Sequence, residues 1–269
     1  MDDFFNIVLL FLAGCAGGFL SGLLGVGGGI IFVPIYDYFL RKSGVTGTDV
    51  VSYTLADSLF SVMVSGFAGS ITVFKNKMLD YKVFLPVSIS AICSITLSTV
   101  FINSIEWYSP VKFKIFFSIL LVYVLFKTIF YNARSTENDK MTTRLCVIAG
   151  LVTGTISGFS GVGGGIIMIP IFTIFGKMDI KKASILSLAV IPVLALPNLL
   201  INVFESPVTK LEYSTGYISW MLVLPVVAGV LSTIRLGFKT AKLLSVETIK
   251  AIFVGFIIIS LINIIISIF

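Results

Sequence analysis

The chain consists of long, predominantly apolar blocks that are separated by short polar stretches. Val111–Phe126 and Ala251–Phe269 are examples, and neither shows the alternation of a half-buried strand or the narrow stripe of an amphipathic helix. A helix needs about 20 such residues to cross the hydrocarbon core of a bilayer. The pattern therefore predicts a protein made of membrane-spanning helices.

The first apolar block is too long for one crossing. Phe4–Leu40 spans 37 residues and as one helix reaches about 55 Å, against a hydrocarbon core of about 30 Å. We expect it to break at Gly25–Gly29 (Gly-Val-Gly-Gly-Gly), because each glycine costs a helix about 1 kcal/mol. The block at Gly161–Gly165 is expected to break in the same way. Asp2 and Asp3 are opposite in charge to the start of a signal peptide, so we expect the first segment to be retained.

The two breaks belong to an internal repeat. Ser21–Ile35 and Ser157–Ile171 are identical at 11 of 15 positions, at a constant offset of 136 residues. An offset of about half the chain indicates a tandem duplication, with repeat 1 at 1–135 and repeat 2 at 136–269. The expected fold is an all-α polytopic membrane protein of 8–10 segments, each repeat holding a broken pair and three further helices. The predicted helices are 4–24, 29–40, 50–74, 83–104 and 111–131 in repeat 1, and 143–160, 165–176, 180–204, 217–236 and 247–269 in repeat 2.

Composition agrees with a membrane protein and excludes several kinds of chemistry. Of the 269 residues, 57% are hydrophobic and 12% charged, with a mean hydropathy of +1.08, whereas soluble domains carry about 25% charged residues. The absence of histidine excludes histidine-bound metals and Ser–His or Cys–His nucleophiles. Cys15, Cys93 and Cys146 match no metal motif and are expected to be small packing residues. We therefore expect no enzyme activity, cofactor, metal or nucleic-acid partner.

Positive charge is spread unevenly between the predicted loops. Fourteen of the 19 Lys and Arg residues lie in 75–82, 127–144, 177–182 and 235–250, which share one side if each broken pair returns to the side where it started. The positive-inside rule places that side in the cytoplasm. Both termini then lie outside, and the second repeat crosses the membrane in the opposite sense to the first. Inverted repeats with interrupted helices near the midplane are typical of secondary transporters.

The glycine runs are the main candidates for a binding site. A helix that starts after a backbone break presents unpaired N–H groups and the positive end of its dipole, which suits an anion. Two such ends, related by the inverted repeat, are expected to face one central site. The alternative is that the runs serve packing, as Gly14, Gly18 and Gly22 are expected to do. The candidate substrate-binding residues are Gly25, Gly27, Gly28, Gly29, Gly161, Gly163, Gly164, Gly165, Ser21, Ser157, Thr54, Ser58, Ser187 and Asn198.

Asp57 is the other candidate for a functional role. It lies well inside the predicted helix 50–74, on a polar stripe with Thr54, Ser58 and Ser61. A carboxylate inside a membrane helix is costly and by default suggests function, so Asp57 is a candidate coupling site for a proton or a cation. A cation-coupled transporter or channel is therefore the alternative to an anion transporter. A protonated acid bonded to neighbouring hydroxyls is the structural explanation for the same residue.

The duplicated Gly-Val-Gly-Gly-Gly-Ile-Ile-x-x-Pro motif, at Gly25–Pro34 and Gly161–Pro170, resembles the sulfite exporter TauE/SafE family over essentially the whole chain. The resemblance implies a permease of the bacterial inner membrane that exports sulfite, sulfoacetate or another small organosulfur anion. The expected partners are that anion and the lipid bilayer, with a homo-oligomer left open. No Walker motif is present, so we expect an ion gradient or the membrane potential to drive transport.

Overall fold

The computed structural model describes residues 2–75, 79–104, 108–130, 141–241 and 243–266. In these ranges the chain forms ten α-helices and one hairpin, so the all-α class is confirmed. The first half contains α1 (Asp2–Leu24), α2 (Gly29–Lys42), α3 (Asp49–Lys75), α4 (Tyr81–Ser104) and α5 (Pro110–Phe130). The second half contains α6 (Thr143–Ser160), α7 (Gly165–Ile174), α8 (Ile180–Phe204), β1 (Ser214–Thr215), β2 (Ile218–Ser219), α9 (Trp220–Ala241) and α10 (Val246–Ile266). The described residues do not include the last residues of two predicted helices, 131 and 267–269, or the predicted repeat boundary at 135/136.

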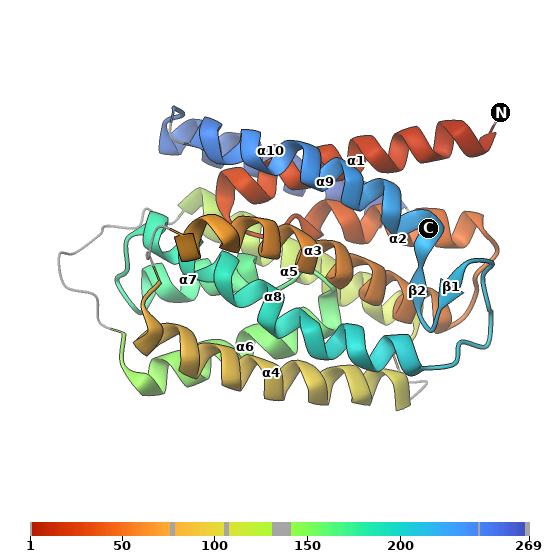
Figure 1. Cartoon of the computed structure of the whole chain (residues 1–269), viewed down its shortest axis with the longest axis horizontal. Helices are drawn as coiled ribbons and strands as arrows, with labels where there is room; N and C mark the ends of the chain where they lie inside the picture. Colours follow the sequence, from red (N-terminus) through yellow and green to blue (C-terminus); the bar gives the residue numbers. More distant parts are fainter. Residues whose placement is uncertain (1, 76–78, 105–107, 131–140, 242, 267–269) are drawn as a thin grey trace.

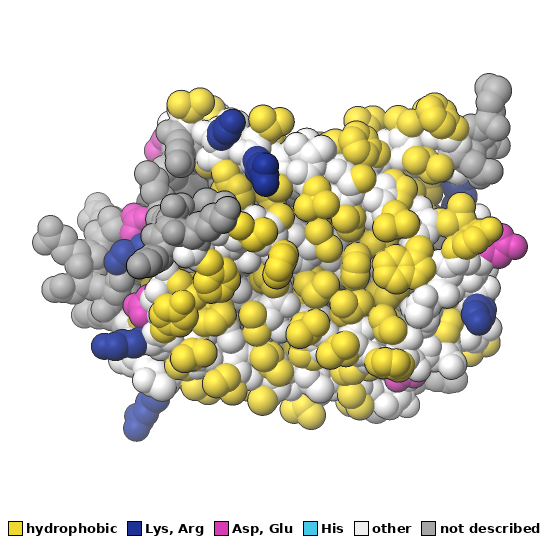
Figure 2. Space-filling model, in the orientation of Figure 1, with side chains coloured by type: hydrophobic (Ala, Val, Ile, Leu, Met, Phe, Trp, Pro, Cys, Tyr) yellow, Lys and Arg dark blue, Asp and Glu magenta, His cyan; other side chains and the backbone are white. Residues whose placement is uncertain are grey.

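The surface of the helix bundle is that of a membrane protein. The long helices run along the longest axis of the molecule (Figure 1). In the described part of the chain, α1, α3, α4, α6, α8 and α9 are long and apolar enough to cross a membrane. Large side chains such as Ile89 and Leu97 are 61% and 73% exposed, and hydrophobic atoms cover the middle of the face in Figure 2. An apolar surface of this extent is covered by lipid, so the protein crosses the membrane several times.

The start of α9 differs from the sequence-based prediction. A helix was expected at 217–236, but β2 pairs with β1 in a short antiparallel hairpin, and α9 starts at Trp220 and extends to Ala241. The turn of the hairpin contains Gly216 at φ 57°. The N–H of Trp220 then donates to the carbonyl oxygen of Tyr213 at 3.1 Å, which ties the helix start to the hairpin.

The end of α7 also differs, because the helix predicted at 165–176 stops at Ile174. The N–H groups of Phe175 and Gly176 both bond to the carbonyl oxygen of Ile171, at 3.0 and 3.3 Å. Lys177 then adopts a left-handed φ of 52°. A left-handed residue that follows shared carbonyl bonds is a common way to end a helix.

Glycines bring α1 and α9 into backbone contact, and we call this contact the α1–α9 seam. A Cβ at Gly18 would lie 2.6 Å from the Cα of Val230, and one at Gly237 would lie 3.0 Å from the Cα of Gly22. Separations this short leave no room for a side chain. Packing is therefore what Gly18 and Gly22 provide, as expected from their spacing.

The α4–α6 seam repeats this arrangement with the two halves exchanged. Gly150, Gly154 and Gly158 of α6 face the serines of α4, and a Cβ at Gly158 would lie 2.6 Å from the Cβ of Ser98. The hydroxyl of Ser94 donates to the carbonyl oxygen of Gly150 at 3.4 Å. Each seam therefore joins a helix of one half to a helix of the other. Between the seams α3 packs on α8, again one helix from each half.

Candidate functional site

The short helices α2 and α7 each begin directly after a left-handed glycine. Gly28 (φ 83°, ψ −2°) and Gly164 (φ 74°, ψ −25°) occupy the N-cap positions, and neither helix has a side-chain cap. This backbone costs a residue with a Cβ about 1–2 kcal/mol. Space excludes a side chain as well, since a Cβ at Gly28 would lie 2.7 Å from the carbonyl oxygen of Gly17.

The two glycine runs lie against each other. A Cβ at Gly29 would lie 2.6 Å from the Cα of Val162, and one at Gly165 would lie 2.8 Å from the Cα of Val26. Each run therefore packs on the backbone of the other. The structure thus brings together two segments that are 136 residues apart in the sequence.

Hydroxyl groups of the two central helices bind the broken backbone crosswise. Ser58 of α3 donates to the carbonyl oxygen of Gly161 at 2.7 Å, and Ser187 of α8 donates to the carbonyl oxygen of Gly25 at 3.1 Å. Each carbonyl lies directly after a helix end, where the regular intrahelical bond is missing. Ser58 and Ser187 therefore each stabilise the break that belongs to the other half.

The N–H groups at the starts of both short helices have no partner in the described part of the chain. Those of Gly28, Gly29 and Ile30 at α2, and of Gly164 and Ile166 at α7, make no hydrogen bond, although all five residues are buried. Buried backbone donors are nearly always paired with protein, water or a ligand. With the helix dipoles, these donors make two adjacent regions of positive potential that suit an anion.

Apolar side chains enclose this region in the present conformation. A Cβ at Gly27 would lie 2.9 Å from the Cγ1 of Val62 on α3 and 3.3 Å from the Cδ1 of Ile191 on α8, and Val62 also packs against Gly163. Val62 and Ile191 thus fill the space beside the glycines that directly precede the unpaired N–H groups, which are themselves buried. The structure therefore shows the region in a closed state.

The hydroxyls near the breaks fall into paired and unpaired groups. Ser21 and Ser65 share a hydrogen bond of 2.5 Å. Among the described residues, the hydroxyls of Ser157 and Thr54 are buried without a hydrogen-bond partner, and so is that of Thr153, which packs against Gly164. Thr153 was not among the predicted site residues. Its position one turn before Ser157 on α6 was the available signal.

Asn198 lies farther from the breaks than Ser187, the other predicted residue of α8. It follows Ser187 by 11 residues, which is about 16 Å along a helix. Its carboxamide nitrogen donates to the hydroxyl oxygen of Thr99 on α4 at 3.0 Å. The two predicted residues of α8 therefore occupy separate places in the bundle.

Asp57 is completely buried and bonded to the segment that precedes α9. Its Oδ1 accepts the backbone N–H of Ser219 at 2.9 Å, and its Oδ2 accepts the Ser219 hydroxyl. A carboxylate that accepts N–H and O–H bonds beside a helix start is electrostatically favourable. One turn further along α3, Ser61 bonds to the hydroxyl of Tyr36 at 2.6 Å. No group of three potential metal ligands occurs among the described residues, and coupling through Asp57 remains a hypothesis.

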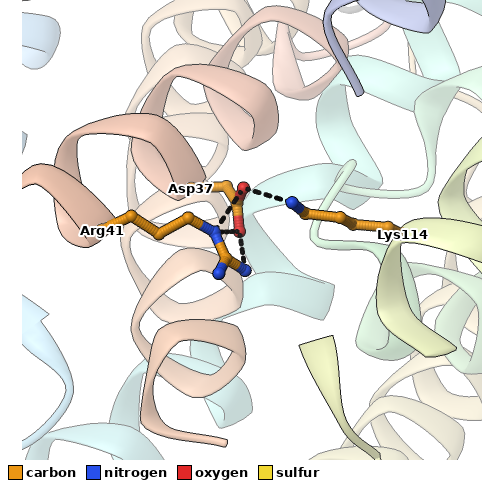
Figure 3. Close-up of polar contacts among 3 residues, drawn as sticks. All are labelled: Asp37, Arg41 and Lys114. Atoms are coloured by element: carbon orange, nitrogen blue, oxygen red, sulfur yellow. Dashed lines mark hydrogen bonds and ion pairs between the residues drawn. The ribbon is translucent and has the colours of Figure 1, made fainter. Parts of the chain in front are cut away.

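A charged cluster at the far end of α2 was missed in the sequence. Asp37 is 7% exposed and accepts bonds from the Nε and Nη2 of Arg41 at 2.9–3.1 Å. The Nζ of Lys114 on α5 approaches the same carboxylate at 3.6 Å, and Figure 3 shows the three side chains pointing toward one another. The spacing of four residues between Asp37 and Arg41 was visible, but it predicts an exposed helix pair rather than a link to α5.

Long apolar helices, a lipid-facing surface and interrupted helices at the centre define a polytopic membrane protein of the kind that includes transporters. The pattern of the family described as "Sulfite exporter TauE/SafE" matches residues 10–264, and the chain belongs to this family.

Similar proteins carry transporter names. One is the "Probable membrane transporter protein MJ0441" of Methanocaldococcus jannaschii, 27% identical over 248 residues, 90% of this chain and 89% of that protein. A "Probable membrane transporter protein" of Haemophilus influenzae is 28% identical over 261 residues, 96% of this chain and 97% of the relative. "Probable membrane transporter protein YunE" of Bacillus subtilis is 21% identical over 263 residues, 92% and 93% of the two chains. Family and relatives identify a membrane transporter and point away from an enzyme.

Proposed function

We propose that this membrane transporter is a secondary transporter that exports a small anion, namely sulfite, another sulfur oxyanion or an organosulfonate. The proposal depends above all on one observation: buried N–H groups without partners gather at the starts of α2 and α7, where the two breaks meet. Backbone donors at helix starts bind oxyanions without a positively charged side chain. The family description names sulfite, which indicates which oxyanion to test first.

The proposed mechanism is alternating access between two inverted repeats. Support comes from contacts that recur when the halves are exchanged. Helix α1 packs on α9 as α6 packs on α4, and Ser58 bonds to Gly161 as Ser187 bonds to Gly25. The closed packing of Val62 and Ile191 fits an occluded step of such a cycle. The excess of Lys and Arg in one set of loops favours periplasmic termini in a bacterial inner membrane.

The membrane potential by itself favours the export of an anion. One negative charge that leaves a cell with a negative interior gains about 2.3 kcal/mol per 100 mV of membrane potential. A second ion is therefore not required. Flux in proteoliposomes under a set potential tests this: sulfite, thiosulfate, sulfoacetate, sulfate and chloride are each loaded and their release is measured. If none of the sulfur anions is released, the proposed substrate class is excluded.

Ser157→Ala tests the site itself. The change removes an unpaired buried hydroxyl from α6 and leaves the backbone intact. A hydrogen bond to a charged group contributes about 1.5–3 kcal/mol, so the apparent affinity for the anion should fall about tenfold or more. Ser88→Ala on α4 is the matched control, because that hydroxyl is also buried and unpaired. Equal affinities in the two variants would remove Ser157 from the site.

A further inference from the structure

A narrow crevice lies between α3, α4, α6 and α8, away from the point where the two glycine runs touch. It contains no space as wide as a water molecule, so the helices must separate before a solute can enter. Six of its eight lining residues are polar or glycine. The lining residues are Ser52, Leu55, Thr99, Ile102, Asn103, Gly158, Asn198 and Asn202.

Carboxamide groups form a chain along this crevice. Asn103 donates to Asn202 Oδ1 at 3.2 Å and accepts the hydroxyl of Ser52 at 3.4 Å, while Asn198 donates to Thr99 at 3.0 Å. The carboxamide oxygen of Asn198, a hydrogen-bond acceptor, has no partner among the described residues, although the residue is only 2% exposed. Polar groups among membrane helices are costly, and an unpaired one needs a further reason to be there.

The crevice connects the second glycine run with one end of the bundle. Leu55 lines the crevice and also packs on the break, since its Cδ2 lies 3.1 Å from a Cβ placed at Gly161. At the other end, Asn103 and Asn202 lie within two residues of the ends of α4 and α8. The carbonyl oxygen of Asn202 accepts the N–H of Tyr217 in the connection to α9. The crevice therefore leads from the bundle end to Gly161, which belongs to the run that precedes the unpaired N–H groups of α7.

The polar contact between Asn198 and Thr99 has an apolar counterpart in the other half. Along α3 and α8 the equivalent residues Ser58 and Ser187 differ by 129 positions, which pairs Gly69 with Asn198. Along α4 and α9 the equivalent seam contacts at Val87 and Val226 differ by 139 positions, which pairs Thr99 with Phe238. At those positions the ring of Phe238 lies 3.1 Å from a Cβ placed at Gly69, an apolar contact. A crevice needed only for packing would not have to differ between the halves. The charge distribution of the loops places the polar side outside the cell.

We infer that this crevice is the outer part of the transport route, where carboxamide and hydroxyl groups bind a small oxyanion between the breaks and the periplasm. The inference rests on the proposed transport function and adds the route. Each of these carboxamides has two N–H donors and uses one of them inside the crevice. The second can replace water that an oxyanion loses, without a positive charge that would hold the anion too tightly. Leu55 and Ile102 are the apolar residues of the lining and close the route in the present conformation.

Cysteine accessibility tests the route without depending on flux. Cys15, Cys93 and Cys146 are first replaced by serine, and single cysteines are introduced as Asn198→Cys or Thr99→Cys. Intact cells are treated with the impermeant sulfonate 2-sulfonatoethyl methanethiosulfonate, and unmodified thiols are then counted by a gel shift after denaturation. Leu97→Cys is the control, because Leu97 is 73% exposed on the lipid face two residues from Thr99.

Both crevice cysteines should react at least about tenfold faster than the control, because the reactive thiolate forms only in contact with water. Sulfite should slow the reaction at both positions. Reaction no faster than at Leu97→Cys, or reaction from the cytoplasmic face alone, overturns the inference. The Asn198→Cys and Thr99→Cys variants are also purified. Each must elute as the parent protein does, which shows that it is folded. Flux without labelling would refute the route alone, whereas labelling without sulfur-anion flux would refute the proposed substrate and leave the route standing.

Discussion

Four Gly→Ala substitutions separate the two reasons for glycine at a helix break. Gly28 combines a φ of 83° with backbone 2.7 Å from an added Cβ, whereas Gly44 has the same φ of 83° with nothing within 4 Å. Gly18 lies in a regular helix with the Cα of Val230 at 2.6 Å, and Gly255 is helical with nothing within 4 Å. Left-handed backbone and close contact therefore occur together at Gly28. Gly44 has only the left-handed backbone, Gly18 has only the close contact, and Gly255 has neither.

The expected changes in the free energy of unfolding follow from these geometries. Left-handed backbone costs alanine about 1–2 kcal/mol, so Gly44→Ala should destabilise by about that amount. Overpacking costs about 1–3 kcal/mol, which applies to Gly18→Ala because the seam must open. Gly28→Ala carries both costs, about 2–5 kcal/mol. Gly255→Ala should stabilise the protein by up to about 1 kcal/mol, the difference in helix propensity.

Thermal unfolding in one detergent, followed by circular dichroism, measures the order of the four variants. The expected order of Tm is Gly255→Ala, parent, the two single-effect variants and then Gly28→Ala. The Gly18→Ala/Gly44→Ala double variant should lose the sum of its two parts, since distant sites add. Gly28→Ala as stable as Gly44→Ala would refute the close contact between the break and α1. Flux should be lost in Gly28→Ala and kept in Gly44→Ala.

Three further predictions concern the charged and phenolic groups. Asp57→Asn should leave anion flux unchanged at every pH, whereas loss of all transport would favour the cation-coupled alternative, and purified protein must stay folded for either reading. Asp37→Asn removes charge-assisted bonds from Arg41 and should lower stability by about 1–3 kcal/mol, while the exposed control Lys42→Gln should change Tm little. Burial and the nearby Asp49 carboxylate raise the pKa of Tyr217, so its contribution to stability is complete below about pH 10 and is lost as the pH rises further. Tyr217→Phe should therefore reduce the alkaline loss of Tm, and an unchanged alkaline limb would contradict this.

The helical architecture was largely predictable because it depends on local features. Blocks of apolar residues and two glycine runs indicate where helices start and stop. The hairpin before α9 was not predictable, since strands of two residues have no periodicity and Tyr217–Ser219 continues into an apolar block. Its position depends on the bonds from Ser219 to Asp57, which join residues 162 positions apart.

The candidate site was predictable only in part, for a related reason. The glycines, Ser58 and Ser187 were identified from type and spacing, and the structure brings them together. Thr153 lacked a distinguishing pattern, because its importance comes from packing against Gly164. Asp37 and Lys114 meet across two helices, and no periodicity along either helix reports such a contact. A single sequence contains little information about contacts between elements that lie far apart in the chain.

The α1–α9 seam has a consequence for how the chain is made. Synthesis proceeds at about 5–20 residues per second, and α9 begins about 200 residues after α1 ends. Helix α1 therefore waits in the membrane for about 10–40 s before its main partner exists, with the glycine face that α9 later covers turned toward lipid or the insertion machinery. The α4–α6 seam closes within seconds, because its helices are separated by about 40 residues. Helix α1, the first helix synthesised, is therefore among the last to reach its main partner.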